Sequence, residues 1–346
     1  MRIVTCPQKT PTYITRTANA GGARCLAVLV AVAVALAPQL ARAQSKGAAY
    51  PERPITLIVP FPPGGTTDTL ARALAEGLRA DLGQPVIIEN RSGAGGLIGT
   101  DAVKTAPADG HVLLLTSLNN HIMLPLIQKT SFQPERDLAS IGLAVQSNTA
   151  LLVSNAVPSK TLAQFVEYAR QNPGRLNYSS SGNGSFGHFF TELFKSQAHI
   201  DVAHVPYKGA APSAMALFSN EVQLLIVGYS AVQSNAEAGQ MRVLAQDGDV
   251  RSTLLPSVPT FAEAGFPEFR PTFWLGLSAP KGTPPIVIVR LNQAMNAILR
   301  SPAFEERARK SGWTPLPGTP ADMDKKIASD LSQYGAVVRR LSIKAD

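Results

Sequence analysis

The stretch Val59-Pro60-Phe61-Pro62-Pro63-Gly64-Gly65-Thr66-Thr67-Asp68-Thr69-Leu70-Ala71-Arg72 decides how this chain is interpreted. It follows an apolar run, Ile55 to Val59, that predicts a buried strand, and it precedes leucines at helical spacing. Asp68 stands where the helix would begin, so we predict that it is the N-cap. A strand that turns through Gly-Gly into a helix leaves backbone N–H groups pointing into open space, where they bind anions. The stretch contains no nucleophile with its base, so it indicates binding rather than catalysis.

The first 43 residues have the three parts of a secretory signal peptide. Basic residues without an acid come first, residues 26–37 are uninterruptedly apolar, and Ala41-Arg42-Ala43 supplies the small-residue cleavage pattern. The apolar run is shorter than the roughly 20 residues that a membrane-spanning helix needs. We therefore predict export to the periplasm, with cleavage after Ala43.

Removal of this segment changes what the composition implies. Both cysteines, Cys6 and Cys25, would be lost, which excludes disulfides and thiol chemistry from the mature chain. Five of the basic residues and none of the acidic ones lie in residues 1–43, so the formal charge of +8 falls to +3. A nearly balanced charge argues against nucleic acid as a partner.

The remaining chain alternates short apolar runs with helical patterns, and this alternation restarts after Asn148. Such alternation predicts βαβ units, and one of the helices is predicted at 159–171 with Ser159 as its cap. A late return of strand and helix patterns predicts two α/β lobes joined by two crossing strands. We place residues 44–147 and 272–346 in the first lobe and residues 148–271 in an inserted second lobe. A ligand would lie between the lobes, where strand ends and helix N-termini converge.

A second strand–turn–helix, Ser179 to His188, is rich in small polar residues and is the counterpart of the Gly64 loop. It also comes close to the nucleophile-elbow pattern of hydrolases at Gly184-Ser185-Phe186-Gly187. A secreted serine hydrolase using Ser185 is therefore the alternative function. His199 and His204 follow Ser185 closely, and the only acid between Ser185 and His199 is Glu192, inside the predicted helix itself, which argues against a triad.

Other motifs do not favour a cofactor. The glycines in residues 90–99 run G-x-G-G-x-x-G and follow the second strand, so they do not fit a dinucleotide fingerprint. The five histidines show no metal-binding spacing. We predict no cofactor, no metal and no catalytic residues, and hence no enzyme.

Several motifs together resemble the Bug family, the extracytoplasmic solute-binding receptors of tripartite tricarboxylate transporters. They are Tyr50-Pro51-Glu52-Arg53-Pro54-Ile55, the Val59–Asp68 stretch, residues 89–96, His204-Val205-Pro206-Tyr207-Lys208-Gly209, residues 251–260 and residues 274–280. The resemblance covers nearly the whole mature chain. It implies the type II periplasmic-binding-protein fold and a monomer that captures a small mono- or dicarboxylate. The ligand would go to the membrane permease of a tripartite tricarboxylate transporter or be sensed.

The resemblance also implies the ligand-binding residues. In such receptors backbone N–H groups of the first loop hold the carboxylate, often with bridging waters. By position these and the facing residues are Phe61, Gly64, Gly65, Thr66, Thr67, Asp68, Ser117, Asn119, Ser181, Gly182, Gly184, Ser185, Tyr207 and Gly209. Where relatives tend to carry Gly-Gly and an acid, this chain has Ser219-Asn220-Glu221, Gln223 and then Tyr229. An aromatic Tyr229 at the distal end of the pocket favours a plain or aromatic carboxylate over an amino acid.

Overall fold

A computed structural model describes residues 10–13, 50–130 and 132–341 of the chain. The chain separates into two units, Met1–Ala49 and Tyr50–Asp346, and the fold described below is that of the second. The predicted signal peptide, residues 1–43, lies outside the described residues except for residues 10–13. None of the described helices is both long enough and apolar enough to cross a membrane.

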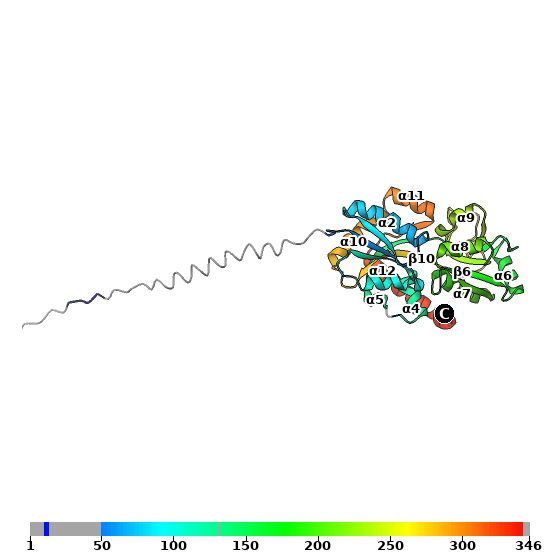
Figure 1. Ribbon diagram of the computed structural model, residues 1–346, viewed down its shortest axis with the longest axis horizontal. Coiled ribbons are helices and arrows are strands. Elements are labelled where there is room, and N and C mark those ends of the chain that lie inside the picture. The colour runs from blue at the N-terminus through cyan, green and yellow to red at the C-terminus, as the bar shows by residue number, and fades with distance from the viewer. Residues whose placement is uncertain (1–9, 14–49, 131, 342–346) are drawn as a thin grey trace, which may run out of the picture. The chain divides into compact units, whose positions relative to one another are not determined.

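The first lobe is built on a six-stranded sheet of order β11-β4-β10-β3-β1-β2. Figure 1 shows this lobe beside the second one. β1 pairs in parallel with β2 and β3, whereas β10 runs antiparallel to β3 and β4. Its strands are β1 (Ile55–Val59), β2 (Val86–Asn90), β3 (Val112–Ser117), β4 (Leu138–Ser147), β10 (Phe273–Pro280) and β11 (Trp313–Pro315). The four apolar residues of β1 are all buried, and they do not alternate with polar ones because both faces of the strand are covered.

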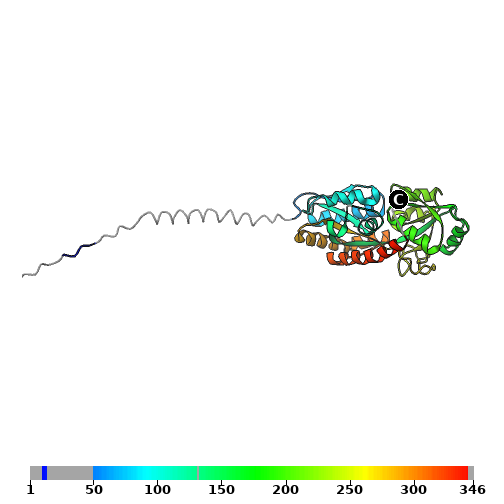
Figure 2. The same ribbon diagram turned by 90° about the horizontal axis from the view of Figure 1, so that it is seen from below.

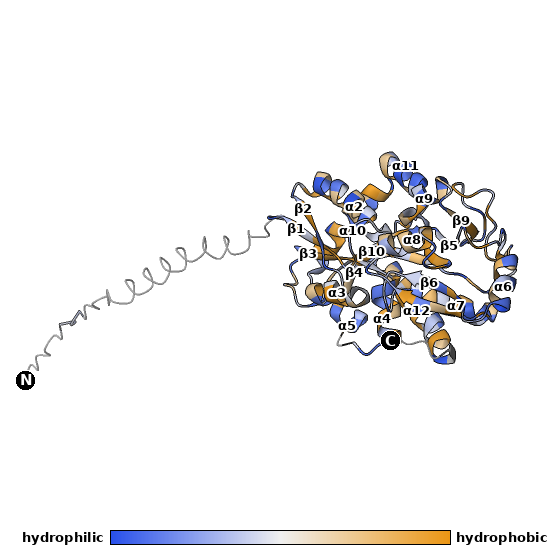
Figure 3. Ribbon diagram, turned by 45° about the vertical axis from the view of Figure 1, so that its right-hand side comes forward, coloured by the Kyte–Doolittle hydropathy of each residue, from blue (hydrophilic) through white to orange (hydrophobic). Residues whose placement is uncertain are grey.

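Helices cover this sheet and hide its apolar side chains. They are α2 (Thr66–Leu82), α3 (Leu97–Lys104), α4 (Leu124–Ile127), α5 (Pro134–Asp137), α10 (Pro285–Leu299), α11 (Pro302–Ser311) and α12 (Pro320–Leu341), with short turns η1 (Ala94–Gly96) and η2 (Asn119–Met123). The outward faces of α2 and α11 are hydrophilic in Figure 3, while the strands are mostly apolar. This is the amphipathic pattern that packs a helix on a core.

The second lobe is built on a five-stranded sheet of order β7-β6-β8-β5-β9. Its strands are β5 (Thr149–Ser154), β6 (Leu176–Ser180), β7 (Val202–Pro206), β8 (Leu224–Gly228) and β9 (Met241–Gln246). Its helices are α6 (Leu162–Gln171), α7 (Phe186–Ala198), α8 (Ala210–Phe218) and α9 (Gln233–Glu237), with the turn η3 (Tyr229–Ala231). The two lobes thus form the type II periplasmic-binding-protein fold. Their exact boundaries in the sequence remain a prediction.

The chain crosses between the sheets where β4 passes through Asn148 into β5, and it returns before β10. The backbone N–H of Asn148 donates to Gly312 O at 2.8 Å, and Asn148 O accepts from the N–H of Tyr229 at 2.7 Å. Asn148 therefore bonds to both lobes at the crossing. The long helix α12, red in Figure 2, adds a second connection. Its Tyr334 packs edge-on against Phe189 and Phe190 of α7.

Two predicted caps were wrong. α2 begins at Thr66, so its N-cap is Gly65, and Asp68 lies within the first turn instead. α6 begins at Leu162, and its N-cap is Thr161 rather than Ser159, because the Thr161 hydroxyl accepts from the N–H of Gln164. In both cases more than one residue near the start of the helix is a favourable N-cap. The backbone conformation decides which of them is used, and the sequence does not show it.

Candidate functional site

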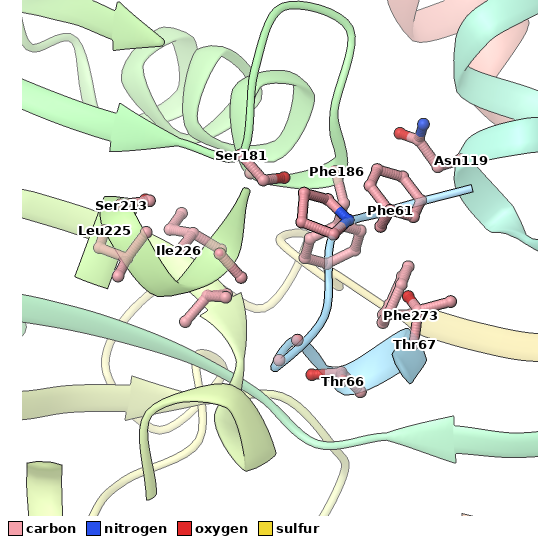
Figure 4. Close-up of a pocket in the computed structure, with 16 residues that line it drawn as sticks. Phe61, Thr66, Thr67, Asn119, Ser181, Phe186, Ser213, Leu225, Ile226 and Phe273 are labelled. Atoms are coloured by element: carbon pink, nitrogen blue, oxygen red, sulfur yellow. The ribbon is translucent and has the colours of Figure 1, made fainter. Parts of the chain in front are cut away.

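A cavity of about 60 Å³ lies between the two lobes (Figure 4). Strand ends, loops and helix N-termini from both lobes form its wall. The lining residues are Phe61, Pro62, Gly65, Thr66, Thr67, Asn119, Ser181, Phe186, Gly187, Ala210, Ser213, Leu225, Ile226, Val227, Gly228 and Phe273. None of these described lining residues is ionisable. Any charge on a ligand must therefore be met by backbone dipoles and neutral polar groups.

The N-terminus of α2 opens onto this cavity without a side-chain cap. Its N-cap, Gly65, has no side chain, and the first helical bond is donated by the N–H of Thr69 to Gly65 O at 3.0 Å. The earlier N–H groups, those of Thr66 and Thr67, have no acceptor within the helix. An uncapped helix of 17 residues presents a partial positive charge at this end.

Asp68 does not neutralise this end toward the cavity, because its carboxylate is engaged elsewhere. It accepts from the N–H of Gly64 at 3.1 Å, from Nε of Arg72 at 3.0 Å and from Nδ2 of Asn90 at 3.1 Å. Burial alone would raise the pKa of Asp68, but the hydrogen bonds from Arg72, Gly64 and Asn90 outweigh it and lower the pKa. Asp68 therefore stays ionised and holds the Gly64-Gly65 turn in shape.

The second lobe contributes two more helix N-termini to the cavity. Gly209 is the N-cap of α8 and has no side chain, and Ala210 lines the cavity. The first residues of α7, Phe186 and Gly187, line it as well. A methyl group built on Gly65 would be 3.7 Å from Cβ of Ala210, so the ends of α2 and α8 nearly meet. Two uncapped helix ends that converge form an anion site without a charged side chain.

The lobes touch around the cavity. Ser230 Oγ donates to Thr66 Oγ1 at 2.8 Å. A methyl group built on Gly228 would lie 2.8 Å from Thr66 Oγ1, and one on Gly209 would lie 3.1 Å from Cγ of Pro62. A larger residue at Gly228 or Gly209 would press on the other lobe, so the described arrangement is a closed one.

The structure brings only part of the predicted site together. Six of the predicted residues line the cavity: Phe61, Gly65, Thr66, Thr67, Asn119 and Ser181. The other nine do not line it: Gly64, Asp68, Ser117, Gly182, Gly184, Ser185, Tyr207, Gly209 and Tyr229. The order of residues in a loop does not tell which of them line the cavity and which only fix the conformation of the loop.

Several of those nine have structural contacts. Ser117 Oγ donates to Asn120 Oδ1 at 2.8 Å, and the Tyr207 hydroxyl donates to Glu221 Oε2 at 3.2 Å. Tyr229 is buried in the apolar core of the second lobe, so it does not form the distal wall. Gln223, another departure from the family pattern, accepts from the N–H of Asn177 and donates to Asn220 O.

Sequence reasoning missed the apolar wall. It consists of Leu225, Ile226 and Val227 of β8 together with the rings of Phe186 and Phe273, whose centroids are 4.8 Å apart. The signal for Phe273 was its neighbour Trp274, which is buried and donates from Nε1 to Asp330 Oδ2 at 2.8 Å. Since successive residues of a strand face opposite sides, a core position for Trp274 places Phe273 on the other side.

The hydrolase alternative loses its geometric basis at Ser185. The side chain is buried, and its Oγ accepts from the backbone N–H of His188 as the N-cap of α7. A serine and a histidine side chain do pair nearby, but they are Ser180 Oγ and His204 Nε2, 2.7 Å apart. Ser180 Oγ also accepts from the N–H of Gly182 at 3.2 Å, which indicates a role in shaping the turn.

Replacing Ser185 with alanine is therefore expected to cost about 1 kcal/mol of stability, the usual value of an N-cap. Chemical denaturation measures this cost. Ester turnover that was present in the wild type and absent in Ser185→Ala would instead restore the hydrolase alternative.

Comparisons with known proteins agree with this architecture. The sequence model of the family described as "Tripartite tricarboxylate transporter family receptor" matches residues 70–343. Protein BugT of Bordetella pertussis is 38% identical over 297 residues, which are 85% of this chain and 91% of BugT. A protein encoded in the tcbD-tcbE intergenic region of a Pseudomonas strain is 34% identical over 95% of this chain and 97% of its own length.

Solved structures give the same result. Rpa4515 of R. palustris with adipate superposes with a TM-score of 0.83 at 35% identity, covering 85% of this chain and 99% of that one. MatC of Rhodopseudomonas palustris with bound malate superposes with a TM-score of 0.80 at 30% identity, covering 84% of this chain and 100% of that one. The chain therefore belongs to the family of tripartite tricarboxylate transporter receptors, which includes the Bug proteins.

Proposed function

We propose that this receptor closes on a small carboxylate whose charged group lies between the N-termini of α2 and α8. The observation that carries the proposal is that both helix ends lack a side-chain cap and face the same uncharged cavity. An anion between two such ends is stabilised by both helix dipoles and by several N–H donors. The relatives solved with adipate and malate support the carboxylate class.

The rest of the cavity favours an apolar ligand body. Its far wall is made of β8 side chains and phenylalanine rings, and no described lining residue carries a charge that could pair with a second carboxylate or an ammonium. The closed cavity of about 60 Å³ holds roughly five water-sized groups. A short aliphatic monocarboxylate fits best, and a longer or an aromatic ligand requires the lobes to move apart.

Asn119 supplies one further polar contact. Its Nδ2 donates to Gly95 O at 2.6 Å, which fixes the orientation of the amide. Its Oδ1 is buried and has no partner among the described residues. In the proposed complex this oxygen accepts from a bridging water or from a hydroxyl group on the ligand.

The proposed setting follows from the sequence and the family. The signal peptide is removed after Ala43, and the mature monomer works in the periplasm without enzymatic activity. It delivers its ligand to the permease subunits of a tripartite tricarboxylate transporter or presents it to a sensor. The proposed contacts are those of the cavity lining, with Gly64, Asp68 and Gly209 shaping the two helix ends.

A thermal-shift panel tests the proposal. Because a ligand that binds only the folded state stabilises it, a carboxylate at one hundred times its Kd adds about 2.7 kcal/mol and raises Tm. We expect butyrate to raise Tm, and butyramide, which has nearly the same shape without the charge, to leave it unchanged. A panel of carboxylates without any shift contradicts the proposal. A larger shift with succinate than with butyrate would place a second carboxylate at the start of α7.

A further inference from the structure

The crossing between the lobes collects buried polar atoms that lack a hydrogen-bond partner. Five of the twelve such atoms among the described residues lie there: Ser147 Oγ, Asn148 Nδ2, Thr149 Oγ1, Asp247 Oδ2 and Trp313 Nε1. A buried polar group without a partner costs stability, because it has given up its bonds to water. Opening of the lobes that lets water in would give these atoms hydrogen-bond partners.

Asp247 is the only one of the five that can carry a charge. It follows β9 directly, and it is tied to the first residue of β5 twice. Its Oδ1 accepts from the N–H of Thr149 at 2.8 Å, and its own N–H donates to Thr149 O at 2.9 Å. Only 5% of the residue is exposed. A charge on Asp247 therefore lies directly beside β5, the strand that follows the crossing.

No described cation forms an ion pair with Asp247. A cavity of about 700 Å³ borders it, and a smaller one adjoins it. The charged residues that line them are Asp249, Arg251, Arg270, Arg300, Glu305 and Arg309. Arg270 pairs with Asp249, Arg251 with Glu263, and Arg309 with Glu306. Because no ion pair compensates for its burial, the pKa of Asp247 rises to about 7, although the hydrogen bond from the N–H of Thr149 acts to lower it.

We propose that Asp247 is a proton switch for closure of the cleft: it is protonated when the lobes are closed and ionises when they open and water reaches it. The switch controls closure over the ligand site proposed above. Its biological purpose rests on that proposed function, but its physical basis does not. The protonated carboxyl tolerates the buried position of Asp247 better than the carboxylate does. Protons therefore favour the closed form, and this preference is lost as the pH rises through the pKa of the closed form.

The size of the effect follows from the two ionisation constants. If Asp247 returns to its ordinary pKa of 3.8 on opening and has a pKa of about 7 when closed, the closed-to-open ratio falls about tenfold from pH 6 to pH 8. The affinity for a ligand that binds only the closed form falls with the closed fraction, by at most this factor.

A distance measurement without ligand tests the switch. Ala80 on α2 and Ala163 on α6 are exposed and lie in different lobes, so they can be replaced by cysteine and spin-labelled. Cys6 and Cys25 are replaced by serine in the same full-length chain. We expect the short-distance population to shrink between pH 6 and pH 8, and Asp247→Asn, which keeps an acceptor for Thr149 but cannot ionise, to remove this change.

Asp249→Asn is the matched control. It neutralises a neighbouring carboxylate that lines the same cavity but is 82% exposed and paired with Arg270. The proposal expects this variant to keep the wild-type pH response. A wild-type distance distribution that does not change with pH, or a response that survives in Asp247→Asn, overturns the proposal. Neither outcome bears on whether a carboxylate binds in the cleft.

A measurement on the unmodified side chain covers the case in which Asp247→Asn does not fold. Carboxyl-carbon NMR of the wild-type protein should show one aspartate with a midpoint near pH 7. A titration in which every aspartate has its midpoint below about pH 5 contradicts the proposal.

Discussion

Replacing Gly228 with alanine is expected to weaken carboxylate binding roughly 5- to 150-fold and to leave each lobe folded. Gly228 has φ −59° and ψ 124°, which alanine adopts without strain. In the closed arrangement, however, the added methyl group would lie 2.8 Å from Thr66 Oγ1 in the other lobe and 3.2 Å from Ser147 Oγ. Overpacking of this kind costs about 1–3 kcal/mol, and here the cost falls on closure alone. Isothermal calorimetry with the carboxylate that gives the largest thermal shift measures the loss.

Gly335→Ala is the matched control for this variant. Gly335 lies within α12, and a methyl group there would have no neighbour closer than 3.4 Å. We expect its affinity to equal that of the wild type. If Gly228→Ala binds as tightly as the wild type, the ligand does not depend on the closed arrangement described here. If it loses its fold, the added methyl group disrupts the packing of β8 itself, and circular dichroism separates the two cases.

The main features of the fold could be predicted from the sequence because strands and helices leave periodic patterns. The apolar run of β1, the Gly-Gly turn and the restart of the pattern after Asn148 led to two α/β lobes, and the structure has two α/β sheets linked at that residue. Family motifs then identified the receptor class, which the comparisons confirm.

The site was predicted less completely, for a physical reason. A loop residue lines a cavity or shapes its loop depending on a few backbone angles, and sequence does not report these. Asp68 illustrates this, because a carboxylate in the first turn of a helix can cap, bind a ligand or turn back, and here it accepts from Gly64. The distal wall was harder still. Leu225 to Val227 belong to an ordinary apolar strand, and only the approach of the first lobe turns them into a cavity wall.

Replacing Phe190 with alanine is expected to lower the free energy of unfolding by about 3–5 kcal/mol. Phe190 is fully buried at the place where α7 meets α12 and the segment before β10. Its ring centroid lies 4.6 Å from that of Phe186, 5.6 Å from that of Tyr334 and 6.2 Å from that of Phe269. Truncation removes the buried surface and leaves a cavity among rings that cannot collapse far, because each of them is held by other aromatic neighbours.

Phe218→Ala is the matched control, since it removes the same atoms from α8 where the side chain is 42% exposed. Urea unfolding of both variants should show a large fall in midpoint for Phe190→Ala and a change of less than about 1 kcal/mol for Phe218→Ala. Because Phe190 packs against Phe186, which lines the cleft, its loss should also loosen the cleft wall and weaken carboxylate binding. Equal effects of the two substitutions on stability would mean that the ring contacts of Phe189 and Phe190 with Tyr334 contribute little to holding the lobes together.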